Sequence, residues 1–268
     1  MTLSALLSRQ FQFPSMPRVL ALMLNELDQP DVDLKKINQL VGTDPALTTR
    51  LLQVANSDAF ALRGKVVSAA QALALLSSTQ IRNIAQEAAT AASLKAVPGI
   101  NLQDFWDYSL DTAKVSRSIA GLIHQDQQAA FTAGLLHAVG SLVMHVCAPQ
   151  EMESLAGHMG LLDLRRASVE RNQLGYNYAD VGAGLARQWA FPQILIDALE
   201  NQCAPFRNNV YEPLAGVVHL AVWRTRAREA GLTSNRLAVT FPGAVGLALG
   251  LDMDMVLQQD PFDWSAFA

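Results

Sequence analysis

Hydrophobic and polar residues follow a helical period along most of the chain. Between residues 34 and 41 the apolar positions recur at spacings of three and four, so they share one face of a helix, and Asp33 stands at its N-cap position. Similar amphipathic patterns follow over residues 45–57, 68–76 and 78–94. We expect these short helices to form a compact N-terminal bundle over residues 11–97.

Polar residues mark where several of these helices begin. Asp44 precedes Pro45, which suits the first position of a helix because no backbone N–H is needed there. Ser68 and Gln71 have the spacing of a capping box. Local signals therefore define the helix starts of the N-terminal bundle.

Pro98 and Gly99 interrupt the helical pattern and predict a junction. Beyond them, helical patterns occupy residues 102–123, 129–146, 176–189 and 191–202. The segment 129–146 is apolar nearly all round, which is typical of a central buried helix. Small residues around Gly182 predict a close approach between helices. We expect a second bundle over residues 98–205 and a C-terminal helical extension over residues 206–268, which ends in an aromatic tail with Trp264 and Phe267.

Composition favours an all-α fold and narrows the function classes. Hydrophobic residues make up 50% of the chain and charged residues 16%, and the apolar positions are mostly helix-forming Ala and Leu. A net charge of −4 disfavours nucleic-acid binding, and Arg224, Arg226 and Arg228 are expected to form a solvated helix face. Two isolated cysteines suggest a reducing compartment. No signal peptide is evident and the apolar stretches look too short to cross a bilayer, so we expect a cytoplasmic protein without a membrane partner.

The amino-acid sequence of several segments resembles that of the HDOD family, a group of helical output modules related to the HD phosphohydrolase superfamily. The stretches that carry the resemblance are "DPALTTRLLQVANS", "FTAGLLHAVG" and "YADVGAGLARQWAFP". The resemblance extends over about residues 11–205. It implies a two-part helical bundle whose second part, residues 98–205, is a degenerate HD-like bundle on which the C-terminal extension packs.

The resemblance also implies that a metal site has been lost. Catalytic HD proteins bind divalent metal through a consecutive His-Asp pair and ligands from other helices, but here the pair is His137-Ala138, and alanine offers no donor atom. Tyr108 and Tyr178 stand at two other histidine positions. We therefore expect no catalytic residues, no bound metal and no cofactor. The corresponding residues would line a vestigial pocket: Tyr108, His137, Ala138, Tyr178, Asp180, Glu200 and His219.

Two interpretations of His137 stay open. It is a core residue whose ring is satisfied by a hydrogen bond to a neighbour such as Tyr108 or Tyr178. Alternatively, it joins His219 and either Asp180 or Glu200 in an unusual metal site.

The "DPALTTRLLQVANS" stretch has two interpretations, and the family resemblance suggests that it shapes an interaction surface. Asp44, Arg50, Asn56 and Ser57 would then contribute to an interaction surface. The structural interpretation gives Asp44 the role of an N-cap and Asn56 that of a helix terminator.

These observations favour a non-catalytic signal-transduction module that binds partner signalling proteins or a small-molecule ligand. The alternative is a metal-dependent phosphohydrolase acting on nucleotides or cyclic dinucleotides, with its metal ligands replaced from elsewhere in the chain. A nucleic-acid-binding regulator is disfavoured by the overall charge.

Overall fold

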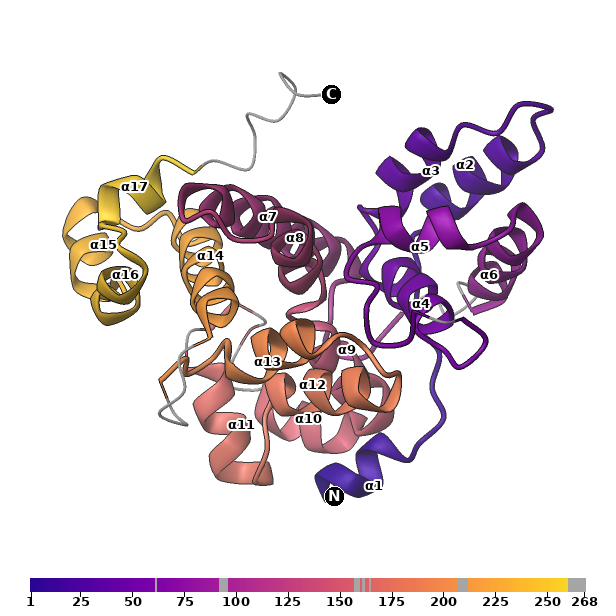
Figure 1. Cartoon of the computed structure of the whole chain (residues 1–268). Helices are drawn as coiled ribbons and strands as arrows, with labels where there is room; N and C mark the ends of the chain where they lie inside the picture. Colours follow the sequence, from indigo (N-terminus) through magenta and orange to yellow (C-terminus); the bar gives the residue numbers. More distant parts are fainter. Residues whose placement is uncertain are drawn as a thin grey trace.

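The protein is built from helices, as Figure 1 shows for a computed structural model of the whole chain. The structure describes residues 1–60, 62–91, 96–156, 160, 162–163, 165–206 and 212–259. Within these ranges the only extended pairing is a single bridge between Val97 and Ile100, at the predicted junction. The expected all-α fold is confirmed. The aromatic tail with Trp264 and Phe267 lies outside the described residues.

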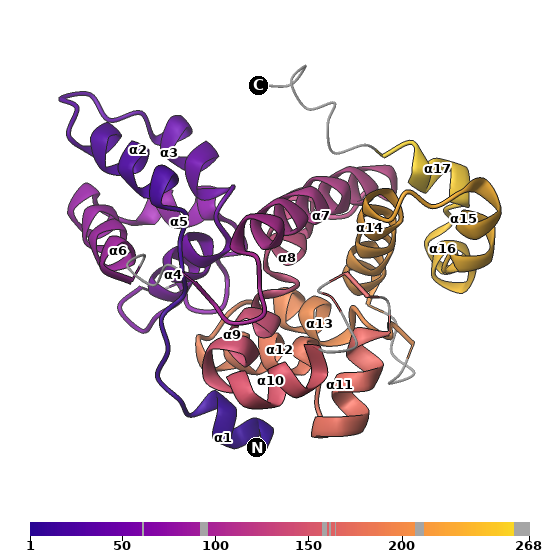
Figure 2. The same cartoon turned by 180° about the vertical axis from the view of Figure 1, so that it is seen from behind.

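The N-terminal bundle forms one end of the molecule (Figures 1 and 2). Its helices are α2 (Pro17–Leu27), α3 (Leu34–Val41), α4 (Pro45–Ala55), α5 (Ala69–Leu75) and α6 (Ser78–Ala91). The predicted caps are present: Asp33 accepts hydrogen bonds from two backbone N–H groups of α3, and Asp44 and Ser68 each accept one at the starts of α4 and α5. The short α1 (Leu3–Leu7) stands apart from this bundle and packs against α12.

The second bundle lies in the middle of the molecule. It contains α7 (Leu102–Leu122), α8 (Gln127–Leu136), α9 (Val139–Cys147), α10 (Pro149–Ala156), α11 (Arg166–Leu174), α12 (Tyr178–Gln188), α13 (Gln193–Asn201) and α14 (Pro213–Glu229). The long α7 packs along both α8 and α14, and α12 packs on α9 and α13. The helix α14, from the predicted C-terminal extension, is thus part of the packing of this bundle.

The apolar segment 129–146 is interrupted, although its pattern predicts one helix. The helix α8 ends at Leu136 and α9 begins at Val139, so His137 and Ala138 lie at the break. Taken together, Gln127–Cys147 is long and apolar enough to cross a membrane, contrary to the expectation from the sequence, but 89% of its most apolar window is buried inside the protein. This burial is what the core of a helical bundle requires.

The helices α9 and α12 touch through their backbones. A β-carbon added at Gly140 would lie 2.0 Å from the carbonyl oxygen of Tyr178 and 2.7 Å from the backbone nitrogen of Gly182. Glycine at position 140 permits this approach because it has no side chain. The close contact predicted around Gly182 is therefore present, and the glycine that it requires is Gly140.

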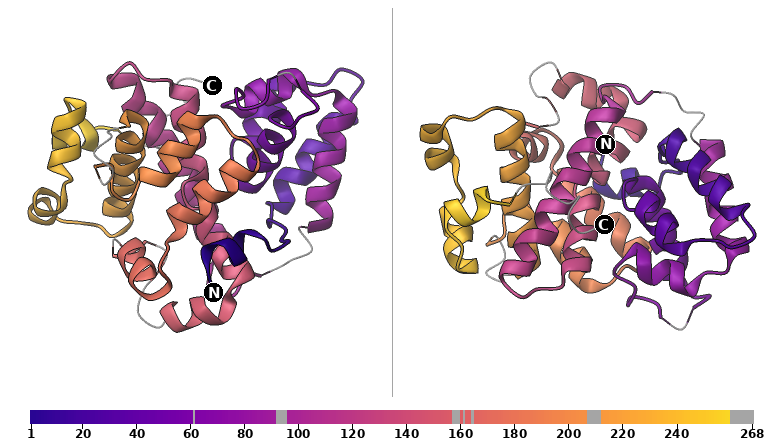
Figure 3. Two further views of the ribbon diagram at one scale, coloured as in Figure 1. Left: turned by 60° about the horizontal axis from the view of Figure 1, so that its bottom comes forward. Right: turned by 90° about the horizontal axis from the view of Figure 1, so that it is seen from above.

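The remaining helices α15 (Ser234–Thr240), α16 (Gly243–Leu249) and α17 (Met253–Leu257) cover the outer side of α14. Figure 3 shows them at the end of the molecule opposite the N-terminal bundle, with the second bundle between. The site that the sequence singles out thus lies in the central part.

Candidate functional site

His137 lies at the break between α8 and α9 and is 1% exposed. Its Nδ1 atom lies 2.7 Å from the carbonyl oxygen of Gly134, so Nδ1–H donates to that oxygen and Nε2 carries the lone pair. No described residue gives Nε2 a hydrogen bond. The expected core histidine with a hydrogen bond to a neighbour is therefore present, but the partner is the Gly134 carbonyl and not Tyr108 or Tyr178. Tyr108 instead meets the imidazole edge to face, with ring centres 4.7 Å apart and planes at 79°.

The space beside His137 is filled by side chains from four further helices. Ala138, Ser141 and Tyr178 border it together with Tyr108, and so do two arginines, Arg166 and Arg226. No room remains there for a water molecule. Four of the seven residues predicted for a vestigial pocket are thus brought together, but around packed side chains and not around a cavity.

The environment of Arg226 differs from the one that the sequence pattern predicts. It is only 8% exposed, and its guanidinium carbon lies 5.8 Å from the centre of the Tyr108 ring, within the range of a cation–π contact. The expected solvated arginine face is therefore absent at this position. Its neighbours are engaged too: Arg224 donates to the carbonyl oxygen of Leu257, and Arg228 pairs with Asp111. All three arginines serve to pack α14 within the protein.

A buried ion pair adjoins the site. The Nε atom of Arg166 donates to Oε1 of Glu170 at 2.6 Å, and the backbone N–H of Tyr178 donates to Oε2 of Glu170 at 2.8 Å. Arg166 also lies 3.0 Å from Nε2 of His145, whose Nδ1 atom lies 2.8 Å from the carbonyl oxygen of Pro98. This network joins α9, α11 and α12 to the junction before α7. Sequence reasoning missed it, because a spacing of four residues between Arg166 and Glu170 is equally typical of an exposed helix pair.

Asp180 and Glu200 do not reach this space. Asp180 accepts a hydrogen bond from the backbone of Asn177 in a capping box, and it pairs with Arg171 at 2.7 Å. Glu200 pairs with Arg187. Both carboxylates border a separate surface depression. Each one therefore lies outside the predicted pocket and already has an arginine partner there.

Gln202 links the ring of His219 to the backbone of His137. Its Nδ1 atom lies 2.6 Å from the carbonyl oxygen of Gln202, and the Gln202 side-chain amide donates to the carbonyl oxygen of His137 at 2.9 Å. The alternative metal site, which needs both histidines and a carboxylate, is therefore not assembled. Among the described residues, no three His, Cys, Asp or Glu side chains gather in an arrangement that could hold a metal ion.

The electrostatics of the site also oppose a cation. Burial, with a smaller contribution from the positive charge of Arg226, lowers the pKa of His137 to about 3 despite the opposing hydrogen bond to Gly134. Burial raises the pKa of Tyr108 and raises that of Tyr178 well above its ordinary value, so both phenols stay neutral. Neutral phenols, one neutral imidazole and a fixed guanidinium do not fit the divalent metal that HD phosphohydrolases bind.

The predicted interaction surface is divided between core and surface. Asp44 and Asn56 are 0% exposed, so they cannot belong to a contact surface. Asp44 accepts from the backbone of Met16 and Leu47, and burial raises its pKa to about 6. Asn56 bonds to the backbone of Val66 in both directions.

The other two members of that surface are more accessible. Ser57 is partly exposed and donates to a backbone carbonyl of α4. Arg50 borders a depression beside Trp189 and the N-terminal segment. A contact surface formed by these two residues stays a prediction.

Comparison with known proteins assigns a family to this geometry. The family model of the HDOD domain matches residues 13–205. The response regulator MmoQ of Methylococcus capsulatus str. Bath (fragment 20–298) is similar at 28% identity and a TM-score of 0.69, over 91% of this chain and 93% of that one. An HDOD domain protein of unknown function from Geobacter sulfurreducens shares the fold at 21% identity and a TM-score of 0.54, over 96% and 91% of the two chains.

A longer relative is also similar. An uncharacterised protein of Treponema pallidum (strain Nichols) is 23% identical over 211 residues, which are 78% of this chain. The match spans 41% of that protein's length.

Proposed function

Because this chain belongs to the HDOD family, we propose that it is a non-catalytic signalling module that works by binding a partner protein or a small ligand in the cytoplasm. The observation that carries this proposal is the position of Arg226. Its guanidinium lines the same packed space as His137 and Ala138, the residues that resemble the metal-binding pair of the HD superfamily. A fixed cation thus lies beside the position where a hydrolase needs a metal ion.

Charge explains why this arrangement disfavours catalysis. A metal-dependent phosphohydrolase needs carboxylate and imidazole ligands that stabilise a divalent cation and leave room for its bound water. Here two arginines, Arg166 and Arg226, line the space, and Glu170 already pairs with Arg166. A divalent metal ion added there would meet repulsion from both arginines and would find no spare carboxylate.

The signalling part of the proposal is supported by similarity. MmoQ, which is 28% identical over nearly its whole solved fragment, is a response regulator. An intact helical framework around a closed site is consistent with a role in binding, because the packed scaffold can present its outer surfaces to a partner. We do not include nucleic acid among the proposed partners, since the chain carries a net charge of −4.

Elemental analysis combined with hydrolysis assays tests this function. The chain is expressed with manganese and iron in the medium, purified, dialysed, and analysed for metal content. It is then assayed on p-nitrophenyl phosphate, 5′-mononucleotides and cyclic dinucleotides. We expect substoichiometric metal and no hydrolysis above the rate without protein. One tightly held ion per chain, together with hydrolysis that a His137→Gln variant loses, would establish the phosphohydrolase instead.

A further inference from the structure

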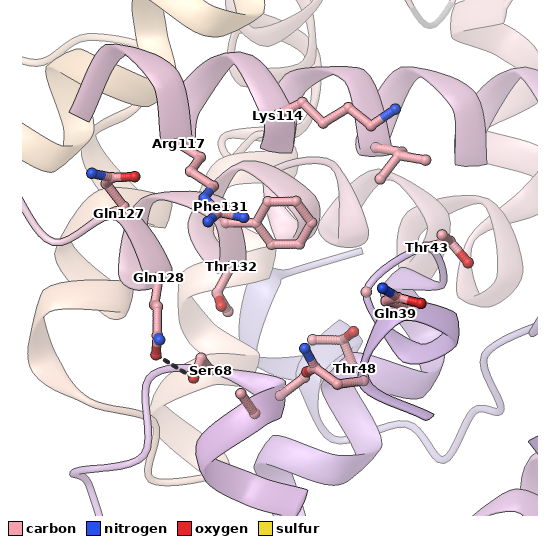
Figure 4. A pocket seen from close by; sticks show the side chains of 15 residues that line it. Gln39, Thr43, Thr48, Ser68, Lys114, Arg117, Gln127, Gln128, Phe131 and Thr132 are labelled. Atoms are coloured by element: carbon pink, nitrogen blue, oxygen red, sulfur yellow. Dashed lines mark hydrogen bonds between the residues drawn. The ribbon is translucent and has the colours of Figure 1, made fainter. Parts of the chain in front are cut away.

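A pocket lined by fifteen of the described residues lies between the N-terminal bundle and the second bundle. It encloses about 450 Å³, within the usual range for small-molecule sites. Helices α3, α4 and α5 supply one wall, and α7 and α8 supply the other (Figure 4). Ser68 at the start of α5 donates to Gln128 of α8 at 2.9 Å, which joins the two walls at one edge. A ligand in this pocket therefore contacts both bundles.

The two walls also approach each other beside α3. A β-carbon added at Gly42, just after α3, would lie 3.7 Å from the ring of Phe131 in α8. The pocket is thus bordered by segments that the tertiary fold brings together, and it is separate from the packed space around His137.

The charge of the lining is one-sided. Lys114 and Arg117 project from α7, one helical turn apart, and none of the described residues that line the pocket is acidic. This sign is opposite to that of the whole chain, which has a net charge of −4. Lysine and arginine side chains that line a pocket can bind an anionic group such as phosphate through charge-assisted hydrogen bonds.

The neutral part of the lining suits a ligand with many polar groups. Four carboxamides and four hydroxyls line the pocket: Asn38, Gln39, Gln127, Gln128, Thr43, Thr48, Ser68 and Thr132. The hydroxyl of the partly exposed Thr43 donates to a backbone carbonyl of α3, so its oxygen keeps lone pairs for a ligand, whereas Thr48 is buried. Carboxamides present both donors and acceptors, which is what recognition of a base edge or a ribose needs.

An aromatic side chain completes the lining. Phe131 of α8 is partly exposed, and Figure 4 places it between the arginine of α7 and the polar wall of the N-terminal bundle. Stacking of a nucleobase on an aromatic ring is sequence-tolerant and favourable. We propose that this pocket, with Lys114, Arg117 and Phe131, binds a nucleoside monophosphate that links the two bundles. This inference rests on the proposed function, since it names the class of small ligand that the module senses.

Isothermal titration calorimetry on the full-length chain tests the site. The probes are AMP, GMP, CMP and UMP, with inorganic phosphate and the matching nucleosides as partial ligands. We expect saturable binding of at least one mononucleotide and much weaker binding of phosphate and of the nucleoside. The Lys114→Gln/Arg117→Gln variant should weaken that binding by at least about tenfold, because charge-assisted hydrogen bonds are lost.

A matched control removes the same charge elsewhere. Arg18→Gln/Lys65→Gln changes two exposed cations outside the pocket and should bind like the wild type. Phe131→Leu should weaken the mononucleotide while leaving the weak binding of phosphate unchanged. Circular dichroism melting of each variant confirms that it is folded.

Three results would overturn the proposal: no mononucleotide binds, phosphate binds as tightly as the mononucleotides, or the pocket variant binds no worse than its control. These results leave the non-catalytic function standing if the protein is free of metal and hydrolytic activity. Conversely, a bound mononucleotide that is slowly hydrolysed supports the pocket and contradicts the non-catalytic function. The two proposals therefore fail separately.

Discussion

The guanidinium carbon of Arg226 lies 5.8 Å from the centre of the Tyr108 ring, inside a core that also holds His137. Tyr108 comes from α7 and Arg226 from α14, and these two helices pack along each other. An arginine is rarely buried without a paired charge, because desolvation of the guanidinium is costly. The cation–π contact with Tyr108 offsets part of this cost. The fixed positive charge lies beside His137 and Ala138, where HD hydrolases have their metal-binding pair.

The imidazole of His137 should make folding stability depend on pH. Its pKa in the folded protein is about 3, below the ordinary 6.5. Between these two pH values the unfolded chain therefore binds a proton at this residue that the folded protein does not bind. This contribution to stability is complete above pH 6.5 and is lost as the pH falls toward 3. Between pH 6.5 and 4.5 the loss is about 2 kcal/mol.

Urea unfolding of the wild type and of His137→Gln at these two pH values checks this expectation. The wild type should lose about 2 kcal/mol more than the variant, since His145 and the other titrating groups are common to both. Equal losses in the two proteins would show that His137 titrates normally when folded.

The backbone contact between α9 and α12 should not tolerate a methyl group at position 140. Gly140→Ala places a β-carbon 2.0 Å from the carbonyl oxygen of Tyr178, so the two helices must separate. We expect a destabilisation of about 3 kcal/mol or more, measured as a lower Tm. Gly182→Ala is the matched control, because its β-carbon meets nothing closer than 3.8 Å and alanine favours a helix. Similar melting temperatures for the two variants would contradict this close packing.

Removal of the Glu170 carboxylate should leave Arg166 as an uncompensated buried charge. The two side chains are 1% and 6% exposed, and Glu170 also accepts from the backbone of Tyr178. We expect Glu170→Ala to cost about 3–5 kcal/mol in chemical denaturation. Asp58→Ala breaks the pair with Arg63 on the surface, where both side chains are more than half exposed, and should change stability little. An equally small effect of both substitutions would rule out a structural role for the buried pair.

Restoring the missing carboxylate alone should not restore a metal site. In Ala138→Asp the new carboxylate would enter a space that Arg226 already lines and that has no room for a water molecule. We expect no stoichiometric manganese or iron in the purified variant by elemental analysis, because the arginine neutralises the added charge. Retention of one ion per chain in this variant would show that Arg226 does not block the site.

Local sequence signals were sufficient for much of the fold. The starts of α3, α4 and α5 follow from Asp33, Asp44 and Ser68, because an N-cap acts on backbone groups only two or three residues away. The break at His137-Ala138 was not predicted, since the apolar pattern continues through both residues. Burial of Asp44 and Asn56 was missed for a related reason: a polar residue whose partners are backbone groups leaves no hydrophobic signal.

The sequence by itself determined the helical class, the starts of several helices, the family and the loss of a carboxylate at Ala138, because each of these depends on residue identity or on neighbours along the chain. Only the tertiary structure decided what occupies the position of the lost site. The packing of α14 against α7 carries Arg226 into the core, while Asp180 and Glu200 find arginine partners outside it. Helical periodicity cannot foresee this outcome, since the same spacing of arginines suits an exposed face until a distant helix covers it.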